Sequence, residues 1–177
     1  VVHEEGVAES EWLSEAHQMV TPPMTRLHAD WNECRGYFLV TDADVVEDGP
    51  GAYEGYQRVS LDDLSDCDSI WGSVVIRDTE TLSNLQALSK LKQYRGFTPA
   101  ITQGLDGLAG FVIYRNEGLE DLRGLEALET ATTLAIVENP ELESLDGLSG
   151  LRSVSWEMRV LGNAALERLT SFGPSLE

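Results

Sequence analysis

The chain has 177 residues, and its 31 acidic against 12 basic side chains give a formal net charge of −19 at pH 7. A surface of this charge repels phosphate backbones and anionic lipid headgroups, so we expect no nucleic-acid partner. No run approaches the ~20 apolar residues that a spanning helix needs, so no membrane insertion is expected. The hydrophobic fraction of 42% suffices for the core of a soluble domain.

Residues 1–57 contain no internal repeat, and we predict that they form an N-terminal cap. The segment 9–20 has apolar residues at helical spacing and is followed by two prolines, which predicts one helix. The segment 36–46 begins as a strand, and 48–56 has the composition of a turn-rich loop.

The densest group of carboxylates in the sequence is TDADVVEDG, which contains Asp42, Asp44 and Asp48. Calcium prefers several oxygen ligands on a loop, so these residues form a weak calcium candidate. The spacing fails the EF-hand pattern, which would need an acidic residue at Val46 and a glycine at Glu47. A solvated acidic turn is the favoured interpretation, and no other cofactor is expected.

Two cysteines, Cys34 and Cys67, allow one disulfide, and neither belongs to a spacing typical of zinc sites. A bridge between them is favoured over two free thiols. It would fix the N-terminal cap to the repeats that follow.

Residues 58–177 contain a repeated pattern. Asn116, Asn139 and Asn163 lie 23 and 24 residues apart, and a leucine follows each of them by three positions. A weaker copy at 74–91 has Thr79 in place of the asparagine. Periods of 20 to 29 residues of this form predict a leucine-rich-type parallel β-solenoid of about four coils.

Each part of the repeat has a physical role. A short strand opens each coil, the asparagine turns the chain and bonds backbone groups there, and a Leu-x-x-Leu-x-x-Leu stretch returns as a 3₁₀ or irregular segment. Alternation along the strands predicts eight inward residues: Val74, Ile76, Phe111, Ile113, Leu134, Ile136, Met158 and Val160.

The outward strand positions form two rows, and four of their residues make an apolar patch where solvated sheets carry polar groups: Val112, Tyr114, Val137 and Leu161. We predict a binding face here, flanked by Trp71 and Trp156. Cross-strand packing, or cover from the N-terminal third, is an equally weighted alternative.

The interval from Ile76 to Ile113 is 37 residues, about 14 more than one period. The excess falls within 92–110, where Pro99 and four glycines argue against regular structure. We interpret this segment as an irregular insertion or a distorted coil.

The sequence offers paired carboxylates but no catalytic constellation. Glu120 with Asp121, or Glu141 with Glu143, could serve a β-helical carbohydrate-active enzyme, yet nothing places two of them opposite each other. We therefore predict a protein that is not an enzyme.

Cys67, Ile70, Gly72 and Ile76, followed by the asparagine and leucine repeats, resemble the receptor L-domain family. The resemblance covers about two thirds of the chain, 58–172. It departs from the family at the irregular coil after residue 91 and in having no closing cysteine after Leu169.

The resemblance implies a right-handed, mainly β solenoid that acts outside the cell or on its surface, without catalysis. The expected partner is a protein or glycan ligand. A structural protein that assembles into homo-oligomers or filaments through its open C-terminal coil is the alternative.

Overall fold

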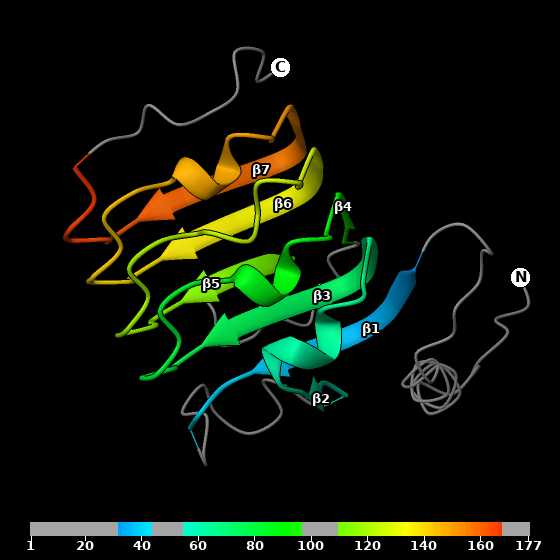
Figure 1. Cartoon of the computed structure of the whole chain (residues 1–177), viewed down its shortest axis with the longest axis horizontal. Coiled ribbons are helices and arrows are strands. Elements are labelled where there is room, and N and C mark those ends of the chain that lie inside the picture. Colours follow the sequence, from blue (N-terminus) through cyan, green and yellow to red (C-terminus); the bar gives the residue numbers. More distant parts are fainter. Residues whose placement is uncertain (1–31, 44–54, 97–109, 168–177) are drawn as a thin grey trace, which may run out of the picture.

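The computed structural model describes residues 32–43, 55–96 and 110–167. Their strands lie side by side, with the 3₁₀ helices and connecting segments in front of the sheet in Figure 1. The strands are β1 (Glu33–Val40), β2 (Gln57–Arg58), β3 (Ser69–Arg77), β4 (Gln93–Arg95), β5 (Phe111–Tyr114), β6 (Thr130–Val137) and β7 (Ser153–Leu161). The 3₁₀ helices are η1 (Leu61–Leu64), η2 (Gln86–Leu88) and η3 (Asp146–Leu148).

The described part of the chain is mainly β, as the sequence predicts, and its seven strands form one sheet in which every pairing is parallel. The order across the sheet is β2, β1, β3, then β4 together with β5, then β6 and β7. Both β4 and β5 pair with β3 on one side and with β6 on the other. These two short strands therefore occupy a single place in the sheet.

The irregular interval of the sequence is an interruption within that shared strand position. Trp71 of β3 pairs with Arg95, and Val74 pairs with Phe111. Without residues 97–109, Gly96 and Gly110 would be the only two residues between Arg95 and Phe111. The interval from Ile76 to Ile113 would then be 24 residues, the same as the interval from Asn139 to Asn163. The predicted insertion at 92–110 is therefore too wide, because Gln93–Arg95 within it form a regular strand of the sheet. Residues 97–109 lie outside the described structure.

The main core lies between the sheet and the connecting segments. Six of the eight predicted inward residues belong to this buried cluster, and Met158 and Val160 pack against it while partly buried. Each fully buried aliphatic side chain contributes about 1.5–3 kcal/mol of transfer free energy. The strand alternation inferred from the sequence is therefore confirmed.

The connecting segments have three residues per turn where they are regular, as predicted. Their leucines fill the core in layers, with less than 2% of each side chain exposed: Leu85, Leu88, Leu91, Leu119, Leu122, Leu125, Leu128, Leu142, Leu145, Leu148 and Leu151. Gly124 has a φ of 109°, and a Cβ there would overlap the Leu85 carbonyl of the neighbouring segment. Neighbouring connecting segments therefore pack backbone against backbone at this point.

The predicted asparagine turn positions form a hydrogen-bonded ladder along the carboxyl ends of the strands. The Asn116 Nδ2 donates to Asn139 Oδ1 over 3.0 Å, and the Asn139 Nδ2 donates to Asn163 Oδ1 over 3.1 Å. Thr79 ends the ladder, because its Oγ1 donates to Asn116 Oδ1 over 2.8 Å. The same amides also donate to strand carbonyls, as Asn139 does to Ile113, so the ladder satisfies backbone groups inside the stack.

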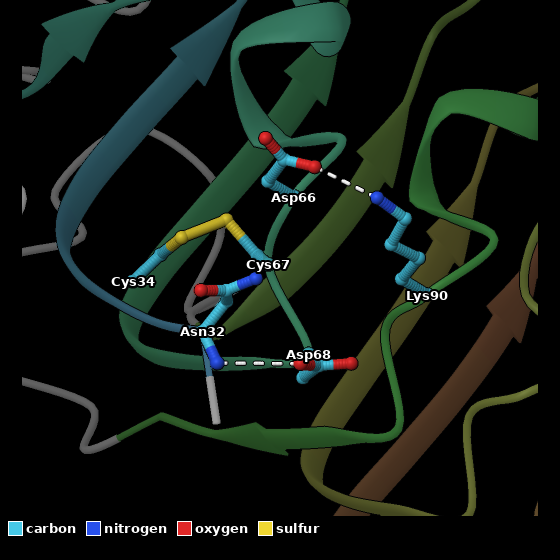
Figure 2. The surroundings of a disulfide bond; sticks show 6 residues. All are labelled: Asn32, Cys34, Asp66, Cys67, Asp68 and Lys90. Atoms are coloured by element: carbon cyan, nitrogen blue, oxygen red, sulfur yellow. Dashed lines mark hydrogen bonds and ion pairs between the residues drawn. A yellow bond between two sulfur atoms is a disulfide. The ribbon is translucent and has the colours of Figure 1, made fainter. Parts of the chain in front are cut away.

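The predicted disulfide between Cys34 and Cys67 is present and is shown in Figure 2. It joins β1 to the segment just before β3, and both cysteines are buried. The backbone N–H of Asn32 donates to Asp68 Oδ2 over 3.2 Å beside it. The bridge thus ties two neighbouring strands together at their amino ends.

The boundary predicted at residue 57 divides segments that share this sheet. β1 lies before the boundary and pairs with β3 over eight residues, from Glu33 with Ser69 to Val40 with Ile76. The predicted helix at 9–20 and the chain beyond residue 167 lie outside the described structure. Among the residues it describes, no helix is long and apolar enough to cross a membrane.

Candidate functional site

The outer face is the face of the sheet opposite the main core, and its strand register brings the predicted rows together. Val75, Val112, Ala135 and Arg159 are neighbours across four strand positions, as are Arg77, Tyr114, Val137 and Leu161. Both rows therefore occur as the sequence predicts.

The apolar part of these rows is mostly buried. Val112 is 0% and Val137 is 8% exposed, and they belong to a second apolar cluster with Leu39, Val75 and Ala135. Such packing corresponds to the cross-strand alternative for this patch. The two valines are thus not positioned for direct contact with a ligand, and a binding role for the patch stays a prediction.

Three large hydrophobic side chains of the described residues are exposed, and all three belong to the predicted set. Trp71 is 39% exposed, Leu161 58% and Trp156 80%. Trp156 lies in β7 where the register with β6 is irregular, opposite the stretch between Ala131 and Thr133. The accessible members of the predicted face are therefore its two tryptophans and its outermost leucine.

Trp71 lies between two arginines on neighbouring strands, and the sequence did not predict this arrangement. Arg35 on β1 and Arg95 on β4 pair with Trp71 in register. Their guanidinium carbons lie 5.1 and 5.5 Å from the indole centroid. Since β1 and β4 flank β3, the two cations contact opposite faces of the ring. We call these residues the Arg–Trp–Arg row.

The two arginines of the row differ in their remaining partners. Arg35 Nη2 donates to Glu33 over 3.1 Å, and the Arg35 Nε is buried without an acceptor. A buried donor without a partner is unfavourable, so stacking and the Glu33 pair offset this cost. Arg95 is exposed and makes no ion pair with any other residue of the described ranges.

The next part of the outer face toward the carboxyl ends is a buried polar network. The Tyr56 hydroxyl donates to Ser73 Oγ over 2.8 Å, and that hydroxyl donates to the Gly110 carbonyl over 3.0 Å. Burial raises the pKa of Tyr56, and the hydrogen bond to Ser73 opposes this shift. The tyrosine is therefore a neutral packing residue that separates the Arg–Trp–Arg row from the second apolar cluster.

A groove of about 800 Å³ lies at the carboxyl ends of the strands, next to the asparagine ladder. Its charged lining includes Asp42, Asp78, Glu80, Arg115 and Glu138. Asp78 accepts a hydrogen bond from Arg77 Nε and forms an ion pair with Arg115 over 3.4 Å. The pKa of Arg115 is raised, chiefly by its hydrogen bond to Tyr114 and then by Asp78.

The structure places only one residue of the calcium candidate. Asp42 Oδ2 accepts from the Glu80 backbone N–H over 3.2 Å and from Thr81 Oγ1 over 3.1 Å, so this oxygen fixes a turn. Asp44 and Asp48 lie outside the described residues. Within the described ranges, no group of three or more histidine, cysteine, aspartate or glutamate side chains is arranged to hold a metal.

The paired carboxylates of the sequence lie on the connecting segments. Glu120, Glu141 and Glu143 are exposed, and Asp121 pairs with Arg123 over 2.8 Å. This arrangement is that of a solvated charged surface.

Comparison with known proteins gives no relative: no family model, curated protein or solved structure matches this chain.

Proposed function

We propose that this chain is a non-catalytic recognition module that binds a protein or glycan ligand through the outer face of its sheet. The observation that carries the proposal is the Arg–Trp–Arg row, an exposed tryptophan held between two arginines. Tryptophan and arginine are the side chains most enriched among residues that dominate binding energy. Placed on paired strands, they form a rigid surface that binds with little ordering cost.

The fold supports this function through its rigidity and its disulfide. We infer that the stacked repeats form a short right-handed solenoid of the receptor L-domain type, in which leucines fill the interior and outward positions can vary. A buried disulfide is typical of oxidising compartments, which favours a secreted or cell-surface location.

The test is binding of the 177-residue chain to a glycan array and to a panel of extracellular proteins. A ligand whose binding falls at least tenfold in Trp71→Ala, and not in Arg123→Ala on a connecting segment, would support the outer face. If Trp71→Ala and Arg123→Ala bind the ligand equally well, the outer face is not the binding surface. Thermal unfolding of each variant separates lost binding from lost folding.

A second candidate function is self-assembly through the C-terminal repeat. Within the described residues β7 pairs only with β6, and its inward Met158 and Val160 are only partly buried. A nine-residue strand with an unpaired edge is a template for another strand. Light scattering from micromolar to millimolar chain tests this, since a constant monomer mass would exclude assembly.

A further inference from the structure

We propose that the Arg–Trp–Arg row is a carboxylate-binding site and that its ligand is an acidic polysaccharide. This inference rests on the proposed recognition function and adds the chemical class of the ligand. It starts from the geometry of the two guanidinium groups, which are fixed on either side of Trp71.

Stacking leaves the edges of the guanidinium groups as the part that can meet a ligand. An arginine on an aromatic face retains in-plane N–H groups that match a carboxylate in a bidentate manner. Arg95 is exposed and pairs with no carboxylate among the described residues, whereas Arg35 uses Nη2 for Glu33. Both faces of the indole are covered by cations, so Trp71 positions the arginines and does not stack on a sugar ring.

The strand spacing sets the separation of the two cations. Arg35 and Arg95 lie on β1 and β4, which are separated by β3 alone. Two steps of the sheet place their backbones roughly 10 Å apart, along a line that crosses the strands. A ligand that engages both must carry carboxylates at a repeat of this order on an extended chain.

The neighbouring outward positions favour a sugar chain over a peptide. One step toward the amino ends, the register aligns Glu33, Ser69, Gln93, Thr130 and Ser153 across five strand positions. Ser69 is buried, and Gln93, Thr130 and Ser153 are partly exposed. Amide and hydroxyl groups suit a polyhydroxylated ligand, whereas the centre of a protein interface needs apolar pockets that exclude water. Apart from the exposed Trp71, Trp156 and Leu161, the described apolar side chains of the outer face lie farther along the strands and are mostly buried.

The site carries a net positive charge, whereas the chain as a whole is strongly negative. The chain carries −19, yet the six outward side chains Glu33, Arg35, Ser69, Trp71, Gln93 and Arg95 include two cations and one carboxylate, which is already paired. A local cation pair gives an acidic protein one face that can bind carboxylates, while the overall field repels the still denser charge of duplex nucleic acid.

The experiment measures binding of polygalacturonate and of its carboxyl-reduced, neutral form by calorimetry at low salt. We expect the acidic polymer to bind at least tenfold more tightly than the neutral one. Arg95→Gln should reduce that preference about tenfold, while Arg123→Gln, which removes the same charge from a connecting segment, should leave it unchanged.

Arg95→Lys is the sharper variant because it keeps the charge and removes the planar fork. Loss of the preference in Arg95→Lys supports bidentate recognition, and full retention overturns it. Equal binding of the two polymers, or tighter binding of poly-L-glutamate or of a single-stranded oligonucleotide, would also overturn the inference. If a neutral array ligand depends on Trp71 while polygalacturonate does not bind, the recognition function stands and the carboxylate inference fails.

Discussion

Among single residues, Asn139 makes the most demanding contribution to the fold. It is completely buried, and its amide donates to the Ile113 carbonyl and to Asn163 while accepting from Asn116. Removing it leaves donors and acceptors without partners in a space that water does not reach. Such groups cost about 1–3 kcal/mol each.

We therefore expect Asn139→Ala to lower the free energy of unfolding by at least about 3 kcal/mol. Asn163→Ala is the matched control, because this residue is half-buried at the end of the ladder and should lose less. Urea denaturation of the two variants measures the difference through the midpoints. Equal losses would show that the ladder does not stabilise its centre more than its end.

Tyr94 makes the free energy of unfolding depend on pH in the alkaline range. Burial raises the pKa of its hydroxyl above the ordinary 10.0, and the hydroxyl donates to the Gly72 carbonyl over 2.6 Å. The unfolded chain loses this proton near pH 10, whereas the native chain keeps it, so stability that is complete below pH 10 falls as the pH rises further.

Tyr94→Phe should flatten that decline, although it also lowers stability at every pH through the lost hydrogen bond. Urea midpoints at neutral pH and at about pH 10.5 give the slope in each protein. The same slope in both would mean that another group controls the alkaline transition.

Among the elements, β1 depends on the disulfide more than the central strands do. The bridge between Cys34 and Cys67 spans 33 positions and holds the amino end of β1 against the segment that enters β3. A bridge that closes a loop of this length stabilises a fold by about 4 kcal/mol.

We expect the Cys34→Ala, Cys67→Ala double variant to lose about this free energy. In hydrogen exchange, the amides of β1 should lose protection before those of β5 and β6. Uniform loss across the sheet would instead indicate one cooperative unit in which the bridge has no local effect.

The shared position of β4 and β5 predicts that the intervening segment is dispensable for the sheet. Deleting 97–109 joins Gly96 to Gly110 and places two residues between Arg95 and Phe111, as Gly72 and Ser73 lie between Trp71 and Val74 in β3. We expect the deleted chain to keep its far-ultraviolet circular dichroism and cooperative unfolding. Loss of the cooperative transition would show that the segment is part of the folded unit.

Those features of the strands and connecting segments that recur with the sequence repeat could be predicted from the sequence. Residues with the same role recur every 23 or 24 positions, so the inward strand residues, the leucines and the asparagine ladder followed from spacing alone. The Arg–Trp–Arg row did not, because Arg35 and Arg95 lie in segments interpreted as a cap and an insertion. Neither segment carries the repeat motif that would have given its register.

The burial of Val112 and Val137 also could not be predicted from the sequence. Alternation assigns a residue to one face of a sheet, but it does not tell whether other parts of the chain cover that face. The sequence therefore placed both valines in the correct rows and left their exposure open.

For the whole molecule, charge is the dominant long-range force. A net charge of −19 opposes compaction, because like charges repel more strongly in the folded chain than in the expanded one. Salt screens this repulsion over distances of about 10 Å at 0.1 M.

The melting temperature should therefore rise by a few degrees between about 20 and 200 mM sodium chloride at neutral pH. At the sequence isoelectric point near 4.3 the same salt should have little effect. Scanning calorimetry at both pH values makes the comparison. A salt effect of equal size at both would assign it to causes other than self-repulsion.

The interrupted strand has a consequence for how such proteins diversify. β4 ends at Arg95 and β5 begins at Phe111, and the strands on either side, β3 and β6, are paired with both of them. Register is thereby held by neighbours and not by chain continuity. Sequence inserted at such a break is free to change in length and content without shifting any other residue in the sheet, so new surface can evolve while the interior stays as inherited.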